Sequence, residues 1–106
     1  MRIIKVLVEN IDDEMNDVEK YYKEALNAKT DDDIDTFNLT LKLANEEMEH
    51  ANLLHSLIVK KIEQKKYELK ANNQEVPNFM LDYWNDEHEK YIERASKLKY
   101  MIDLIK

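Results

Sequence analysis

Glu47 and His50 are the residues of this chain whose types and spacing are best suited to chemistry. They lie three residues apart within the stretch 44–54, and residues three apart on a helix occupy neighbouring parts of one face. A carboxylate and an imidazole placed in this way can bind one metal ion, as they do in carboxylate-bridged metal bundles. Glu is abundant in the chain, so the spacing alone has low specificity and the surrounding pattern must support it.

The composition predicts an all-α protein. Among 106 residues there is no Gly and one Pro, while 37% are charged and 43% are apolar. Tight turns of β-structure need residues at positive φ, which Gly supplies most readily, whereas Glu- and Lys-rich apolar mixtures are typical of long amphipathic helices. The absence of Cys excludes a disulfide, a Cys-ligated zinc site and an iron–sulfur site in this chain.

The charge and hydropathy pattern argues against two classes of partner. The net charge of -7 does not suit binding to a nucleic-acid backbone, which depends on clustered Lys and Arg. No apolar run approaches the roughly 20 residues needed to cross a bilayer. The apolar residues near the N-terminus are interrupted by Lys5 and followed by acidic residues, unlike a signal sequence. We therefore expect a cytoplasmic protein that binds neither nucleic acid nor membrane.

The apolar periodicity predicts three helices in one domain, residues 1–106. The first two, at about 2–28 and 34–71, form an antiparallel hairpin within 1–71, and the third occupies about 77–106. Thr30 or one of the three following Asp residues can cap the second helix. An EF-hand calcium loop is the weaker alternative there, because its expected Gly is missing. Pro77 suits the first turn of the third helix.

Glu14 interrupts the apolar stripe of the first helix. That stripe comprises Ile4, Leu7, Ile11, Val18, Tyr21 and Ala25, and Glu14 occupies its one gap. An ionised carboxylate in a buried stripe is costly unless a cation or another charged group accompanies it. Glu14 is therefore expected to be either a metal ligand or half of a buried ion pair.

The register of the hairpin brings Glu14 level with Glu47. With the turn centred between residues 30 and 31, the two Glu residues are each about 16 to 17 residues from it, hence at the same height at ~1.5 Å rise per residue. Two carboxylates and the His50 imidazole would then meet in one apolar layer. Like charges repel strongly in such a layer, which favours metal binding over a metal-free buried polar network.

The third helix adds one candidate ligand, Glu87, within the stripe Met80, Trp84, Tyr91, Leu98, Met101 and Ile105. A short loop after residue 71 would place Glu87 level with about residue 60, roughly 15 Å from the height of Glu47. Glu87 is thus a ligand only if the chain takes a longer path, and Arg94 is an alternative partner for it. His55 is expected to be structural, and His88 receives no role.

Residues 10–60 resemble the first helical hairpin of ferritin-like proteins, and rubrerythrins in particular. The resemblance rests on Glu14, on Tyr21 seven residues later, and on Glu47 with His50 in an Ala- and Glu-rich segment. The family normally repeats this hairpin, but the residue three before His88 is Asn85, so a second Glu-x-x-His is missing. Without Cys there is no rubredoxin domain, and a rubrerythrin-type reaction would need a separate electron donor.

The small encapsulated ferritin-like proteins are similar in design, with half a bundle in each chain. The resemblance implies that a homodimer or larger homo-oligomer completes the bundle and holds two Fe ions at the subunit interface. It implies a bridging role for Glu47, a terminal role for His50 and either role for Glu14. The implied activity is oxidation of Fe(II) by oxygen or peroxide, with Tyr21 as a hydrogen-bond partner of a ligand or simply a core residue.

Two other interpretations remain open at this point. The chain could be a metal-free helical-bundle interaction protein, in which the three polar residues form a buried cluster with Arg94 or a Lys. It could instead bind a metal without turnover. Carboxylate and imidazole ligands accept iron, manganese and zinc alike, so the sequence does not identify the metal.

Overall fold

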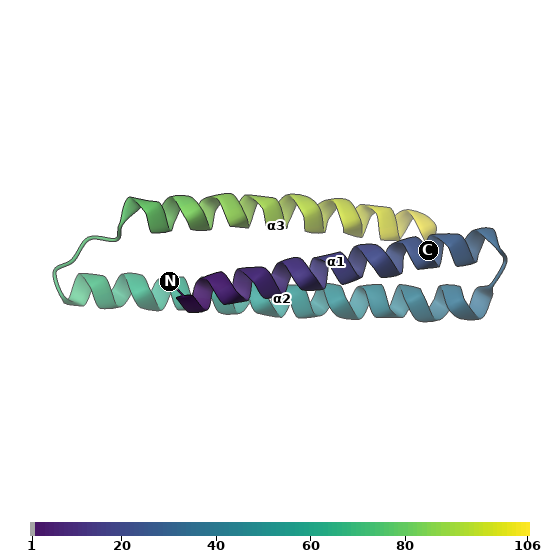
Figure 1. The fold of residues 1–106 in the computed structure, drawn as a ribbon, viewed down its shortest axis with the longest axis horizontal. Coiled ribbons are helices and arrows are strands. Elements are labelled where there is room, and N and C mark those ends of the chain that lie inside the picture. The colour runs from purple at the N-terminus through teal and green to yellow at the C-terminus, as the bar shows by residue number, and fades with distance from the viewer. Residues whose placement is uncertain (1) are drawn as a thin grey trace.

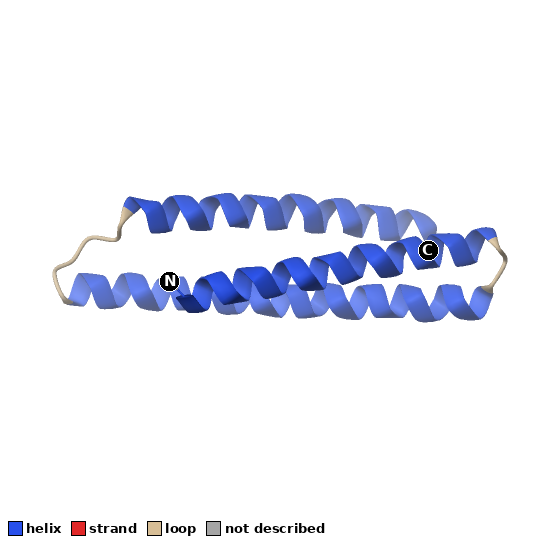
Figure 2. Cartoon of the chain, in the orientation of Figure 1, coloured by secondary structure: helices blue, strands red, loops and turns tan. Residues whose placement is uncertain are grey.

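The computed structural model describes residues 2–106 and is entirely α-helical over that range. Its helices are α1 (Arg2–Thr30), α2 (Ile34–Ala71) and α3 (Asn78–Ile105) (Figures 1 and 2). They form an elongated bundle with extents of 62 × 17 × 17 Å. The all-α prediction is confirmed, and the helix bounds differ from the expected ones by at most two residues. The predicted domain range begins at Met1, which lies outside the described residues.

The core lies mainly between α1 and α2, which run in opposite directions side by side (Figure 1). One face of α1 is buried along its length, and Ala44, Ala51, Ile58 and Ile62 of α2 pack against it. Fully burying one large apolar side chain contributes about 1.5–3 kcal/mol, so this long contact is the main source of stability. Small Ala residues at two of these positions allow the helix axes to approach closely.

The buried face of α1 differs in detail from the predicted stripe. Met15, only 1% exposed, occupies the core position between Ile11 and Val18, and Tyr22 is more deeply buried than Tyr21. Glu14 therefore lies at the edge of the stripe and does not fill it. The reason is that residues at positions 11, 15, 18 and 22 follow the helical period as closely as those at 11, 14, 18 and 21.

The turns are built without Gly. Between α1 and α2, Asp32 adopts φ 57°, and the side chain of Asp33 accepts a hydrogen bond from the Thr36 backbone at 3.1 Å. This confirms the predicted capping of α2 by one of the Asp residues. After α2, Asn73 adopts φ 55°. Asp and Asn tolerate the left-handed region better than most residues, so these residues substitute for the missing Gly.

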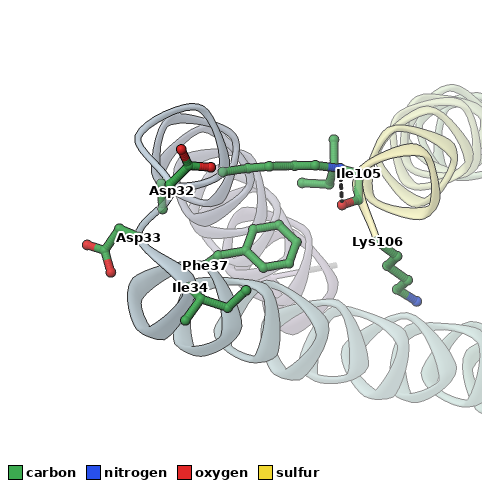
Figure 3. A pocket seen from close by; sticks show the side chains of 8 residues that line it. Asp32, Asp33, Ile34, Phe37, Ile105 and Lys106 are labelled. Carbon is green, nitrogen blue, oxygen red and sulfur yellow. Dashed lines mark hydrogen bonds between the residues drawn. The ribbon is translucent and has the colours of Figure 1, made fainter.

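Helix α3 lies farther from the other two, with few close backbone approaches to α1 and fewer to α2. It runs in the same direction as α1 and buries Tyr91, Leu98, Ile102 and Ile105 (Figure 1). At one end, Lys29 Nζ donates a hydrogen bond to the Ile105 carbonyl at 2.9 Å. Figure 3 shows this contact beside an open pocket, which Phe37 also lines. The attachment of α3 thus depends on a limited set of side chains.

None of the three described helices contains an apolar stretch long enough to cross a membrane.

Candidate metal centre

Glu14, Glu47 and His50 form a compact cluster between α1 and α2. Each offers one ligand atom, and these atoms all lie within 4.8 Å of one another. His50 Nδ1 is 3.7 Å from Glu14 Oε2 and 3.6 Å from Glu47 Oε2. The structure therefore brings together three of the four residues that the sequence singled out as candidate metal ligands.

The two helices position these side chains through their regular geometry. Glu47 and His50 project from neighbouring parts of α2 because they are three residues apart. Glu14 directly precedes the buried residue Met15 on α1 and therefore lies at the edge of the core. Its carboxylate points toward His50 of α2. Exposed side-chain fractions of 28% for Glu14, 21% for Glu47 and 55% for His50 show that the cluster is most open at His50.

One atom of the cluster lacks a hydrogen-bond partner. Glu14 Oε2 is buried and accepts no hydrogen bond within the described residues. Burying a charged oxygen without a partner costs about several kcal/mol in proteins. A cost of this size favours binding of a cation or uptake of a proton. Two arrangements would remove this penalty: a metal ion among the three side chains, or a protonated His50 between the two carboxylates.

Glu87 does not join the cluster. It lies beside a small cavity that Asp12, His55 and His88 also line, and it pairs with Lys90 at 3.4 Å. Burial, followed by the charge of Glu87, raises the pKa of Asp12. Glu87 is level with the region of His55 on α2, consistent with a short connection between α2 and α3, and so it lies away from Glu47.

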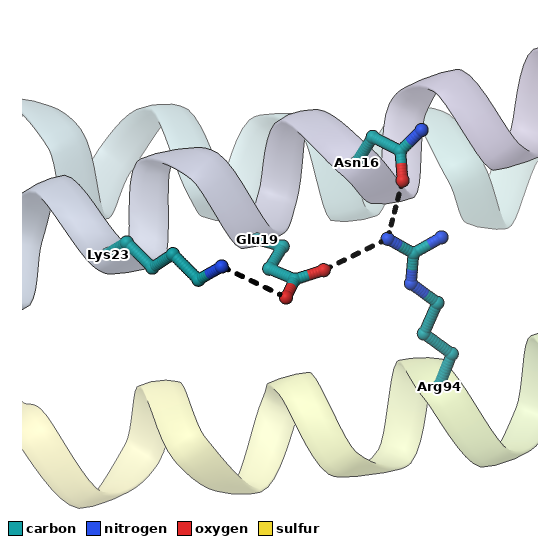
Figure 4. Close-up of polar contacts among 4 residues, drawn as sticks. All are labelled: Asn16, Glu19, Lys23 and Arg94. Carbon is teal, nitrogen blue, oxygen red and sulfur yellow. Dashed lines mark hydrogen bonds and ion pairs between the residues drawn. The ribbon is translucent and has the colours of Figure 1, made fainter.

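Arg94 is also occupied elsewhere. Its guanidinium donates to Glu19 at 3.1 Å and to Asn16 at 2.7 Å (Figure 4). Hydrogen bonds from Arg94 and then from Lys23 lower the pKa of Glu19. Arg94 thus joins α3 to α1. It does not neutralise Glu14 or Glu47, which is what a metal-free cluster containing Arg94 would require.

Tyr21 is half-buried and packs against the core. The Lys20 ammonium lies 5.6 Å from the centre of its ring. The contacts of Tyr21 fit the core-packing interpretation, and its suggested role beside a metal ligand stays a prediction.

A second polar group, centred on His55, was not anticipated from the sequence. His55 Nε2 and His88 Nδ1 share a hydrogen bond at 2.9 Å, and the Tyr91 ring stacks on His55 with centroids 4.6 Å apart. The Tyr91 hydroxyl donates to Asn52. Trp84, His88 and Tyr91 lie on one face of α3 at spacings of four and three. That spacing was the available signal, but their partner on α2 could not be known from it.

Comparison of the chain with protein-family models, with curated proteins and with solved structures gives no match. The functional argument therefore depends on the residues of the chain itself.

Proposed function

We propose that the protein is a di-iron carboxylate protein that oxidises Fe(II), with Glu14, Glu47 and His50 as metal ligands. The observation that carries the proposal is the buried, partnerless Glu14 Oε2 within 3.7 Å of His50 Nδ1. This carboxylate oxygen has no hydrogen-bond donor among the described residues to balance its negative charge. A divalent cation would supply a positive charge and use all three side chains at once.

The donor set fits the first-row metals. Two carboxylates and an imidazole are ligands that iron, manganese and zinc accept. Ligands of one such ion lie about 2.0–2.2 Å from it. Atoms within 4.8 Å of one another can reach these positions with small side-chain rotations. The compact geometry therefore supports metal binding without rearrangement of the helices.

A second copy of the chain would complete a dinuclear centre. One chain supplies two Glu and one His, and two chains supply the four Glu and two His found in di-iron carboxylate bundles. Two-fold symmetry gives this duplication automatically. The exposed side of the cluster, at His50, is where another chain can approach. The proposed assembly is a homodimer or a larger homo-oligomer built from such pairs.

Two Fe(II) ions held at such a centre would supply one electron each, enough together to reduce oxygen to hydrogen peroxide with uptake of two protons. The chain itself provides the charge balance. The Glu14 and Glu47 carboxylates would offset the higher charge of Fe(III), and the His50 imidazole would offer Nδ1 as a ligand. Both carboxylates are partly buried, which would restrict the access of water to the bound iron. In this proposal Fe(II) is itself the reductant, so iron oxidation requires no separate donor protein.

The similarity to ferritin-like and rubrerythrin-like proteins belongs to this proposal. It is supported by the proximity of Glu14 to Glu47 and His50 on two adjacent helices. A rubrerythrin-type peroxidase activity would additionally need an external electron donor.

One observation favours a second candidate, a metal-free helical interaction protein. His50 lies at ion-pair distance from both Glu14 and Glu47, so a protonated His50 would balance part of their charge. The two candidates differ in what occupies the cluster, a metal ion or a proton on His50.

Oxygen consumption after addition of Fe(II) tests the proposed activity. The wild type should consume oxygen faster than Fe(II) alone, and Glu47→Gln should reduce this rate to the background. Glu63→Gln is the matched control because Glu63 lies on the same helix, is exposed and pairs with Lys66. Equal rates for wild type and Glu47→Gln would reject the ferroxidase proposal.

A further inference from the structure

Helix α2 carries a row of side chains that runs along one flank of its buried face and passes through His50; Leu43 and Glu46 of this row are half-buried. Its members recur at alternating spacings of four and three residues: Leu39, Leu43, Glu46, His50, Leu53 and Leu57. Leu39 is 58% exposed, Leu53 69% and Leu57 39%. Neither α1 nor α3 covers these leucines. Leucines that recur at this spacing along a helix are typical of the contact seam of a coiled coil.

The row is symmetric about position 48. Leu39 and Leu57 are equally far from that position, as are Leu43 and Leu53, and so are Glu46 and His50. When a second α2 lies antiparallel across the first, with a two-fold axis at this height, each leucine therefore meets a leucine. The only polar pair is Glu46 with His50 of the second copy, which is a carboxylate facing an imidazole. A parallel arrangement would place His50 on His50 and Glu46 on Glu46.

We propose that this row is the interface with a second copy of the chain, packed antiparallel with its two-fold axis near position 48. The self-complementary order of leucines and the Glu46–His50 pairing identify the occupant. A two-fold interface must match itself in this way, whereas a surface that binds an unrelated partner need not. The row extends over ~27 Å of helix at ~1.5 Å per residue, long enough for three layers on each side of the axis.

The same packing has a consequence for the metal cluster, and this part rests on the proposed function. Glu47 lies beside the row, next to its centre, on the side of α1. Across the two-fold axis it comes close to Glu47 of the second copy, with Glu14 of each chain alongside. Glu46 of each chain reaches the exposed edge of His50 in the other and can orient that imidazole. Glu46 thus acts as a positioning residue supplied by the partner.

Oligomeric mass of the metal-free protein tests the interface independently of metal binding. The wild type should be a dimer at micromolar concentration, and Leu53→Asp should be monomeric with unchanged helix content, because Leu53 is exposed within one chain. Leu104→Asp is the matched control: Leu104 is similarly exposed, at 64%, but lies on α3, so this variant should stay dimeric. A monomeric wild type, or a dimeric Leu53→Asp variant, would overturn the proposal.

Cross-linking tests the antiparallel register. The chain contains no Cys, so single Cys substitutions report unambiguous pairs. A mixture of Leu43→Cys and Leu53→Cys proteins should form a disulfide between the two variants on mild oxidation. Each variant alone should remain uncross-linked, since like positions would be about 15 Å apart along the helix. Cross-linking of each variant only with itself would contradict the register.

The outcomes separate this inference from the proposed function. A dimer that cross-links as predicted but binds no iron keeps the interface and rejects the metal centre. Iron binding by a monomeric wild type keeps Glu14, Glu47 and His50 as ligands and rejects the interface. Retained dimerisation with altered metal-ion absorption in Glu46→Gln would support the positioning role of Glu46, and an unaltered spectrum would reject it.

Discussion

Glu14 Oε2 on α1 lies 3.7 Å from His50 Nδ1 on α2 and has no hydrogen-bond partner within the described chain. This contact joins the two helices at the layer where Glu47 also points inward. A neutral imidazole with its Nδ1 lone pair toward the carboxylates adds no positive charge, and a protonated imidazole does. The state of this one contact therefore separates a metal centre from a metal-free ion-pair cluster.

Glu14→Gln should distinguish the two states by thermal unfolding. In the metal-free protein, removing an unpaired buried charge should leave the free energy of unfolding unchanged within about 1 kcal/mol or raise it. Mn(II) at 100 times its dissociation constant should stabilise the wild type by about 2.7 kcal/mol and the variant far less. Destabilisation of the metal-free variant, with no Mn(II) effect on the wild type, would instead support a protonated His50 that pairs with Glu14.

Met15→Ala should be the costly substitution on α1, although the sequence pattern pointed to position 14. Met15 is only 1% exposed, and removing such a side chain typically costs about 2–5 kcal/mol because of lost transfer energy and a residual cavity. Asp13→Ala, at an exposed neighbouring position, should change stability by less than about 0.5 kcal/mol. Urea unfolding measures both, and equal effects would contradict the assigned buried face.

The period of the apolar residues was sufficient to predict three helices, and the polar stretch from Asn27 to Asp33 was sufficient to predict their first connection, although α1 continues to Thr30. Equal distances from that connection placed Glu14 and Glu47 at one height, which the structure shows. The orientation of α1 to within one residue was not predictable, because rows through Glu14 or through Met15 match the helical period equally well. The axis of the facing helix decides between them.

The environment of α3 was harder to predict because it depends on contacts between distant segments. His88 had no assigned role, and His55 was treated as an isolated core residue. In the structure a hydrogen bond joins the two side chains, His55 on α2 and His88 on α3. The place of Glu87 depended on the path of the connection after α2, which has no periodic signal. Ile34 is apolar and opens α2 but is 68% exposed, since α2 begins beyond the core at that end.

The His55 pair should make stability depend on pH. Burial, followed by the proximity of His88, lowers the pKa of His55 below 6.5. The unfolded chain therefore binds a proton at this residue more readily than the folded chain. The contribution of His55 to the free energy of unfolding is fully present above pH 6.5. It is lost as the pH falls below that value through the pKa of the folded state.

Melting temperatures between about pH 8 and pH 5 measure this dependence. The wild type should lose stability over the lower part of the range, and His55→Gln should show a smaller loss. The same slope in both proteins would show that His55 does not contribute.

Metal stoichiometry measured together with oligomeric mass, after anaerobic loading with Fe(II), tests the central claim most directly. The wild type should bind about two irons per dimer, and Glu47→Gln should bind none specifically. Glu63→Gln and Glu87→Gln should both retain the metal, because neither residue lies in the cluster of Glu14, Glu47 and His50. A wild-type protein that binds no iron, or that loses none on Glu47→Gln, would contradict the account.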